Sequence, residues 1–322
     1  MTLLLTTEDV QDLISIDDAI AVTETVVKEE AAGTVIQVPP FGGAHATAGG
    51  GFLRMVGGGA QSANRIGFRA GLGGENVALV FEMQTNRLLA IVSHVFSNVR
   101  LSACIGLAAR ELAQPGARRI GLVGSGRTAL PSLRGLCAVR PIDQILVYSP
   151  TPEHRTEFAR RAAEALDIDV KAVDTVEAAV ADADIIAVST SAQKPVLFGE
   201  HLRQGVHVNA MGTTHELDES VYLRADQIVA SSRHLELEYT NPMVAFQGLA
   251  TPPLQQLVAD GRLRSEDVVE LGAIVAGDVP GRNGASDISV FRESRGGVGD
   301  VLLANLAFER ARELGRGLEF QF

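Results

Sequence analysis

Short apolar runs and helical patterns alternate through the middle of the chain. Strands are predicted over residues 119–123, 144–148, 170–173, 184–190, 205–212 and 227–231, and helices over 152–166 and 175–181. Strands that are apolar along their length and separated by helices are typical of a parallel sheet covered on both faces. The pattern therefore predicts an α/β fold with a doubly wound sheet.

Local signals mark the ends of the predicted helices. Pro152 suits a first helical residue, whose N–H has no partner within the helix. Asp174 and Glu177 have the spacing of a capping pair before the following helix. Pro131 closely follows the strand at 119–123 and is compatible with a helix only if that helix begins late or bends.

The strand at 119–123 leads directly into the sequence Gly-Ser-Gly-Arg-Thr-Ala. Gly124 permits a tight reversal, Gly126 leaves room for a pyrophosphate, and Ala129 lets the next helix pack closely on the strand. The start of that helix offers unpaired N–H groups and a partial positive charge to phosphates. We predict a Rossmann dinucleotide-binding turn whose cofactor contacts are Gly124, Ser125, Gly126, Arg127 and Thr128.

The end of the second predicted strand bears on the choice of nicotinamide cofactor. An Asp or Glu there would bind the adenosine ribose and repel a 2′-phosphate, but this strand is followed by Ser149, Pro150 and Thr151. Ser149 and Thr151 can donate hydrogen bonds to a phosphate, and Arg127 and Arg155 can supply positive charge. NADP(H) is therefore favoured over NAD(H). In the alternative, Thr151 only caps a helix, the arginines are solvated and either cofactor binds.

A chain of 322 residues exceeds what one hydrophobic core usually organises, so two domains are expected. Helical segments and a glycine-rich, strand-like stretch precede residue 114, and an amphipathic helix follows residue 295. We predict that residues 1–114 and 295–322 fold together as a second, α+β domain, with the Rossmann domain of residues 115–294 inserted between them. A cleft between two domains is a common place for a ligand.

Charge and composition exclude several classes of function. A formal net charge of −11 without a Lys/Arg cluster argues against a nucleic-acid partner. No apolar run is long enough for a bilayer and the first residues lack a secretory signal, so no membrane partner and a cytoplasmic location are expected. Cys104 and Cys137 are interpreted as buried free thiols, and the scattered histidines indicate no metal site.

Two other features could be mistaken for sites of different chemistry. The glycine-rich stretch from Gly42 to Gly59 lacks the Lys-Ser/Thr pair of a nucleoside-triphosphate loop, so hairpin turns and a substrate lid are expected there. Ser125 is not flanked as in Gly-x-Ser-x-Gly, so a hydrolase is unsupported.

Matches along the whole chain resemble the ornithine cyclodeaminase/mu-crystallin family. They include 38–40, 67–69, 88–91, 99–103, 124–129, 183–185, 189–190, 205–212, 216–218, 290–294 and 299–300. The resemblance rests on the order and spacing of these segments, because no single one is specific. It implies a Rossmann domain paired with a dimer-forming domain built from both termini, and therefore a homodimer.

The resemblance also implies a site for the carboxylate of a small-molecule substrate. Arg100 matches the arginine that holds this carboxylate near the nicotinamide, although it could instead pair with an acidic neighbour at a helix start. Arg69 stands where the family usually has lysine, and arginine is a poor proton shuttle because it stays charged. Arg54 is either a further anion contact or an exposed strand residue.

Two departures weaken any transfer of cyclodeaminase activity. Phe41 occupies the place of an arginine that binds the carboxylate, which suggests a substrate side chain less polar than that of ornithine. The family's catalytic aspartate has no counterpart in the shortened loop 211–217. His215 could transfer a proton there and Thr213 or Thr214 could orient a water, but a lone loop histidine is also a common surface or phosphate contact.

These features together favour an NAD(P)H-dependent reductase of a small α-imino acid or cyclic ketimine, or the reverse amino-acid dehydrogenase. Arg100 and Arg69 would hold the carboxylate, and His215 or water would protonate the nitrogen. The expected nicotinamide neighbours are Ser189, Thr190, Met211, Gly212 and Thr213, with Ser294 and Arg295 closing the cleft. Alternatives are an ornithine- or lysine-type cyclodeaminase that recycles NAD, and an NADPH-dependent ligand-binding protein of the mu-crystallin type.

Overall fold

The computed structural model describes residues 1–37, 43–46, 52–72, 74–238, 250–293 and 297–321. Contacts divide the chain into two compact units. The first contains the described parts of 1–100 and 295–322, and the second those of 101–239 and 249–294. The first unit is thus built from both ends of the chain, and the second contains the glycine turn. The predicted fold class, a doubly wound sheet inserted in an α+β domain, is confirmed.

The second unit contains an eight-stranded sheet in which every pair of neighbouring strands is parallel. The strands run in the order β10-β9-β8-β11-β12-β15-β13-β14. They are β8 (Arg119–Val123), β9 (Gln144–Tyr148), β10 (Asp169–Ala172), β11 (Ile185–Val188), β12 (His207–Ala210), β13 (Gln227–Ala230), β14 (Val268–Glu270) and β15 (Ser289–Arg292). The strand order reverses between β8 and β11, which is where ligands bind in sheets of this kind.

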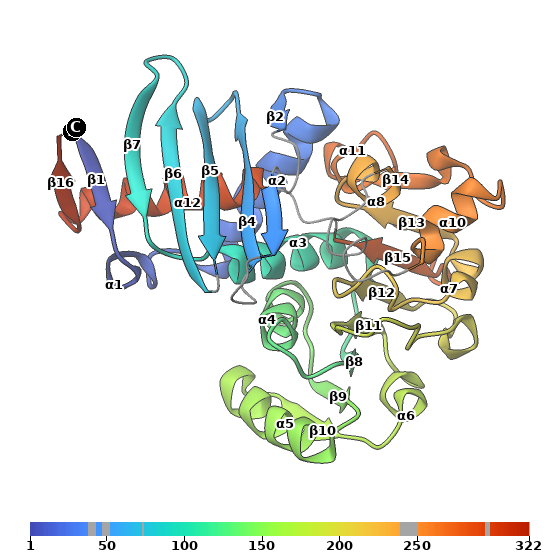
Figure 1. The fold of residues 1–322 in the computed structure, drawn as a ribbon. Coiled ribbons are helices and arrows are strands. Elements are labelled where there is room, and N and C mark those ends of the chain that lie inside the picture. The colour runs from blue at the N-terminus through green and yellow to red at the C-terminus, as the bar shows by residue number, and fades with distance from the viewer. Residues whose placement is uncertain (38–42, 47–51, 73, 239–249, 294–296, 322) are drawn as a thin grey trace. The chain divides into compact units, whose positions relative to one another are not determined.

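Helices connect these strands (Figure 1). They are α4 (Ala129–Val139), α5 (Pro152–Leu166), α6 (Val176–Val180), α7 (Glu219–Arg224), α8 (Arg233–Leu237), α10 (Pro253–Ala259) and α11 (Leu271–Ala276), with 3-10 turns η1 (Gly199–His201) and η2 (Ser265–Asp267). Helix α3 (Ser97–Leu112) begins in the first unit and continues into the second. Because β8, β11, β12 and β15 are almost entirely buried, the sheet forms the centre of this unit's core.

The predicted helix start before α6 was partly wrong. The N-cap is Thr175, whose side chain accepts a hydrogen bond from Ala178 N. Asp174 pairs with Arg155 instead of forming the expected pair with Glu177. Pro131 is accommodated because it is the third residue of α4, within the first turn, where an N–H has no helical acceptor.

The first unit is built on a mainly antiparallel sheet in the order β16-β1-β7-β6-β5-β4-β2, with β3 also paired to β4. Only β1 and β7 pair in parallel among its described strands. The strands are β1 (Thr2–Leu5), β2 (Val35–Gln37), β3 (Gly43–Ala46), β4 (Phe52–Ala60), β5 (Arg65–Leu72), β6 (Glu75–Glu82), β7 (Arg87–Val92) and β16 (Leu318–Phe320). The β3–β4 pair agrees with the hairpin expected in the glycine-rich stretch, whereas residues 47–51 lie outside the described part.

Helices α1 (Thr7–Val10), α2 (Ile16–Ala31) and α12 (Val298–Glu313) complete the first unit. Helix α12 runs across one face of the sheet (Figure 1), where Val298 and Leu302 pack with Val26 and Ala60. Gly58 explains the close approach, because a Cβ there would lie 2.6 Å from Val298 Cγ2. The amphipathic helix expected after residue 295 therefore supplies much of this unit's core.

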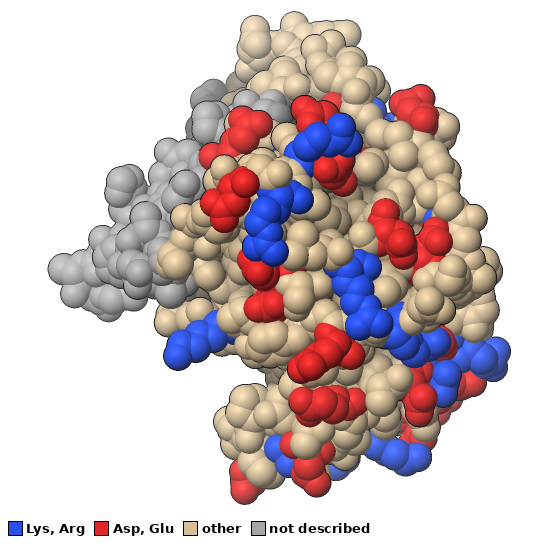
Figure 2. Space-filling view, turned by 90° about the vertical axis from the view of Figure 1, so that its right-hand side faces the viewer, with Lys and Arg blue, Asp and Glu red and all other residues tan. Residues whose placement is uncertain are grey.

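Acidic and basic side chains are interspersed on the face of the molecule shown in Figure 2. Among the helices of the described residues, none is long and apolar enough to cross a lipid bilayer.

Candidate functional site

The glycine turn follows β8 as predicted. Gly124 has a φ of +108°, and a Cβ at this position would lie 2.3 Å from Ser189 O, so only glycine fits without strain. A Cβ at Gly126 would meet no atom within 4 Å, and Ala129 begins α4 as a fully buried residue. The turn thus leaves open space next to its second glycine, directly before a helix N-terminus, as a pyrophosphate site requires.

Two polar pairs join the turn to the ends of neighbouring strands. Ser125 Oγ donates to Ser149 Oγ at 2.8 Å after β9, and Thr128 Oγ1 lies 2.6 Å from Ser189 Oγ after β11. The structure therefore brings together four of the predicted cofactor contacts at the carboxyl edge of the parallel sheet. Hydroxyl groups at this edge can bind the phosphates and ribose of a dinucleotide.

The arginines expected at the end of β9 differ in their surroundings. Arg155 is buried, donates from Nη1 to Ser149 O at 3.0 Å and forms an ion pair with Asp174. Its guanidinium also lies 6.0 Å from the centre of the Tyr148 ring. Arg127 is exposed in the turn, and Thr151 is exposed as the N-cap of α5. Arg155 thus holds the strand end in place, whereas Arg127 and Thr151 face solvent.

The loop after β12 carries the remaining predicted contacts of the second unit. Met211 is buried, and Thr213 Oγ1 donates to Ala192 O. His215 is only 6 % exposed, with Nε2 at 2.7 Å from Ala250 O and Nδ1 at 3.3 Å from Thr214 Oγ1. Both ring nitrogens have protein partners, and the role of His215 in proton transfer stays a prediction.

Glu216, in the same loop, is fully buried and received no role from the sequence. Its Oε1 accepts from Gly212 N at 2.7 Å, and its Oε2 accepts from Thr190 N and Thr190 Oγ1, both at 3.0 Å. Arg292 Nη1 lies 3.4 Å from Oε1, and Arg292 Nε donates to Glu236 at 2.9 Å. Burial raises the pKa of Glu216 to about 7, and the nearby guanidinium of Arg292 counteracts this rise.

The first unit brings Arg69 and Arg100 to a single carboxylate. Arg69 Nε lies 3.3 Å from Asp300 Oδ2, and Arg100 Nε lies 3.5 Å from Asp300 Oδ1. Arg69 also donates from Nη1 to Asn76 Oδ1 at 2.6 Å, and its Nη2 has no hydrogen-bond partner among the described residues. Asp300, on α12, is 3 % exposed. Both guanidinium groups therefore lie against one buried carboxylate, and guanidinium groups are also suited to bind the carboxylate of a ligand.

The other residues predicted near the substrate lie only partly within the described part of the chain. Arg54 lies on β4 and is partly exposed. Ser294 and Arg295 fall outside the described residues, and so does Phe41. Asp300 was absent from the predicted site, although an acidic residue within a helix of buried apolar residues is a signal for a paired charge.

The described residues contain no group of three or more His, Cys, Asp or Glu side chains that could hold a metal ion. Both cysteines are free thiols, and burial raises the pKa of Cys137 to about 11, so its thiolate is scarce at neutral pH. The groups present at the sheet edge, a glycine turn and several hydroxyls, suit a nicotinamide dinucleotide.

Comparison with known proteins identifies close similarities over nearly the whole chain. The model of the ornithine cyclodeaminase/mu-crystallin family matches residues 1–315. A Delta(1)-pyrroline-2-carboxylate reductase of Bacillus cereus is 29% identical over 252 residues, which cover 76% of this chain and 74% of that protein.

Two solved structures share the fold at 25% identity. The Delta(1)-pyrroline-2-carboxylate reductase of Thermococcus litoralis, in complex with NADH and L-proline, has a TM-score of 0.86 and covers 99% of this chain and 100% of its own. The iminosuccinate reductase of Paracoccus denitrificans, in complex with NAD+, has a TM-score of 0.87 and covers 100% of this chain and 99% of its own.

Proposed function

Because the chain belongs to the ornithine cyclodeaminase/mu-crystallin family, we propose that it is an NAD(P)H-dependent reductase of the C=N bond of a small α-imino acid or cyclic ketimine. The reverse reaction would oxidise the corresponding amino acid. The observation that carries the proposal is the buried cluster of Arg69, Arg100 and Asp300 in a chain that also holds a dinucleotide turn. Relatives named as reductases of pyrroline carboxylate and iminosuccinate support the same chemistry.

The arginine cluster would bind and orient the substrate carboxylate. Asp300 occupies the Nε sides of Arg69 and Arg100, and Arg69 Nη2 remains available for a carboxylate oxygen. A guanidinium group holds such a carboxylate by charge-assisted hydrogen bonds. A carboxylate held in this way fixes the neighbouring imine carbon, which is catalysis by positioning. The nicotinamide, when bound, supplies the hydride that this carbon receives.

The nitrogen of the reduced bond needs a proton, which Arg69 is unsuited to supply. An arginine stays protonated in proteins, and Arg69 already donates to Asp300 and Asn76. We propose that His215 or water supplies the proton. The expected cofactor neighbours Ser189, Thr190 and Met211 belong to the same proposal.

NADP(H) is the cofactor that we favour. No acidic side chain follows β9 directly, and Thr151 after this strand and Arg127 in the glycine turn are both exposed. A guanidinium and a hydroxyl in these positions can bind a 2′-phosphate. Dissociation constants for NADPH and NADH test the preference, and tighter binding of NADH by the wild-type protein would contradict it.

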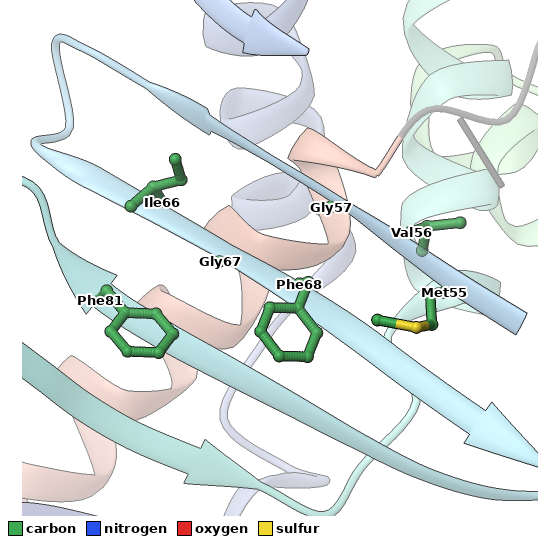
Figure 3. Close-up of a pocket in the computed structure, with 7 residues that line it drawn as sticks. All are labelled: Met55, Val56, Gly57, Ile66, Gly67, Phe68 and Phe81. Atoms are coloured by element: carbon green, nitrogen blue, oxygen red, sulfur yellow. The ribbon is translucent and has the colours of Figure 1, made fainter. Parts of the chain in front are cut away.

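We further propose that the enzyme is a homodimer that forms through the face of the first sheet opposite α12. Leu53, Met55 and Leu72 on this face are 36%, 38% and 46% exposed. A cavity of about 390 Å3 opens there, and Figure 3 shows Met55, Phe68 and Phe81 on the side of the strands away from α12. Large exposed apolar patches mark interaction sites. Met55→Glu should yield monomers by sedimentation, whereas the control Leu223→Glu on α7 should not; a wild-type monomer would refute the dimer.

A cytoplasmic location completes the proposal, since two free cysteines suit a reducing compartment. Its test is fractionation of the producing cells, where recovery outside the cytoplasm would contradict it.

Incubation of the purified protein with NADPH or NADH and a panel of imines tests the reaction itself. The panel should contain five- and six-membered cyclic ketimine carboxylates, iminosuccinate, and pyruvate with ammonia or methylamine. We expect loss of nicotinamide absorbance with at least one of them. Release of ammonia and proline from ornithine with catalytic NAD would instead identify a cyclodeaminase. Cofactor binding without turnover of any compound would identify a ligand-binding protein.

A further inference from the structure

The carboxylate of Glu216 connects the ends of three neighbouring strands in the second unit. Its Oε2 accepts from the backbone and hydroxyl of Thr190, two residues after β11, and its Oε1 accepts from Gly212 N, two residues after β12. Arg292, the last residue of β15, approaches Oε1 at 3.4 Å. Oε2 thus contacts the end of β11, and Oε1 contacts the ends of β12 and β15.

Gly212 packs closely against this carboxylate. A Cβ at Gly212 would lie 2.1 Å from Glu216 Oε2 and 2.2 Å from Thr190 O. Glycine is therefore required at position 212 so that the carboxylate can enter between the two loops. Both Glu216 and Arg292 are almost completely buried, so water does not compete for these bonds.

An ionised carboxylate satisfies all of these donors best, because both of its oxygens are full acceptors. An ionised Glu accepts at both oxygens, whereas glutamine or a protonated acid carries a donor on one side. That donor would face either the N–H of Gly212 or the N–H of Thr190. Losing the charge therefore weakens the hydrogen bonds to one of the two strand ends while the volume of the side chain is retained.

We propose that Glu216 is a positioning residue that holds the loops after β11 and β12 in the shape that receives the nicotinamide end of the cofactor. The inference rests on the proposed function, because Thr190 and Gly212 are expected to border that ring. Glu216 acts through the two loops and does not itself contact the substrate.

Glu216 and the loop residues that it binds, Thr190 and Gly212, form a clamp. This clamp is sensitive to pH because its carboxylate is buried among few compensating charges. The groups that face it are Arg292 on β15, Glu236 on α8 and Tyr222 on α7, together with the N–H groups of Thr190 and Gly212. Burial raises the pKa of Glu216 to about 7, so the clamp loosens as pH falls through neutrality. Cofactor affinity should fall in the same direction, since the loops lose the arrangement that the cofactor requires.

Hydrogen exchange tests the clamp without any cofactor. In Glu216→Gln at a pH of about 8, amide exchange in peptides that cover Thr190 or Gly212 should be about tenfold faster than in the wild-type protein. Peptides from the first unit should exchange unchanged, which separates loss of the clamp from global unfolding. The matched control is Glu200→Gln, whose side chain is exposed on η1. Unchanged exchange at both Thr190 and Gly212 would overturn the inference.

The second test of the inference is the binding of NADH or NADPH, measured by calorimetry between about pH 6 and about pH 8. Wild-type affinity should fall by about tenfold as pH decreases, while Glu216→Gln should bind weakly and equally at all pH values. Thr190→Val, which removes one donor to Oε2, should lie between the two. Parallel pH profiles for wild type and Glu216→Gln would overturn the inference. A wild-type protein that binds neither nicotinamide would refute the proposed function, and the exchange arm would still decide the clamp.

Discussion

Replacing Asp300 by asparagine tests whether one buried carboxylate organises both arginines that we propose bind the substrate. The change keeps the shape of the side chain and removes its charge. Arg69 and Arg100 lie 3.3 and 3.5 Å from the two carboxylate oxygens. Asp300 is 3 % exposed, so water cannot replace the lost charge.

The magnitude follows from these distances. At an effective dielectric constant of about 20, a charge pair at such a separation gains roughly 5 kcal/mol, much of which offsets the desolvation of the ions. Removing one partner of a buried pair typically destabilises a protein by about 3–5 kcal/mol. We expect a loss near the lower limit, about 3 kcal/mol, because both arginine side chains keep a small exposed fraction. Because the substitution removes a negative charge, the site should bind simple carboxylates more tightly, while kcat falls because the arginines lose their orientation.

Urea unfolding followed by circular dichroism measures the stability, and competitive inhibition by pyrrole-2-carboxylate measures anion affinity. Asp182→Asn, at an exposed position, is the control and should change stability by less than about 0.5 kcal/mol. Combining Asp300→Asn with Arg69→Gln should recover part of the lost stability, since fewer buried charges remain unpaired. A loss below about 1 kcal/mol, strictly additive effects or unchanged anion affinity would refute the reasoning.

Three further substitutions address the rest of the account. Gly124→Ala should weaken NADH or NADPH binding by at least about tenfold in calorimetry, because its Cβ would lie 2.3 Å from Ser189 O at a positive φ; unchanged affinity would contradict the proposed turn. Arg100→Lys should lower kcat/KM for the imine by roughly 10- to 100-fold, since lysine cannot hold a carboxylate by two parallel bonds; full activity would exclude that role. Burial lowers the pKa of His207 to about 3, so the unfolded chain binds a proton below about pH 6.5 that the folded chain excludes. The free energy of unfolding should therefore decrease as pH is lowered from about 6.5 to about 3, by roughly 1.4 kcal/mol per pH unit. His207→Gln should remove this slope in acid titration, and a slope equal to that of wild type would contradict the assignment.

Much of the second unit was predictable because its strands are apolar and its turn contains glycine. Strands β8 to β13 and helix α5 agree with the sequence pattern to within a few residues. β14 and β15 were missed, since one has only three residues and the other ends in a charged residue, Arg292. Arg292 is buried there because Glu216 and Glu236 pair with it, and neither partner is near it in the sequence. Pairing of this kind depends on the tertiary fold and is not apparent in local patterns.

The candidate site likewise combines features that the sequence predicted with contacts that it did not. Residue types and spacing predicted the turn at Gly124 and the arginines at 69 and 100. The sequence alone did not predict that Asp300, some 200 residues after Arg100, joins the two arginines. It also did not predict that Arg155 is held by Asp174 and Ser149, because that contact requires two strand ends to meet.

Transfer of deuterium tests the central claim most directly. The purified protein is supplied with NADPH or NADH that carries deuterium at the transferring position of the nicotinamide, together with Delta(1)-pyrroline-2-carboxylate or another imine that it reduces. If the enzyme reduces the C=N bond of an α-imino acid, mass spectrometry and NMR should locate one deuterium on Cα of the amino acid formed, in a single configuration. An amino acid without deuterium at Cα, or no amino acid from any imine despite bound cofactor, would contradict the account.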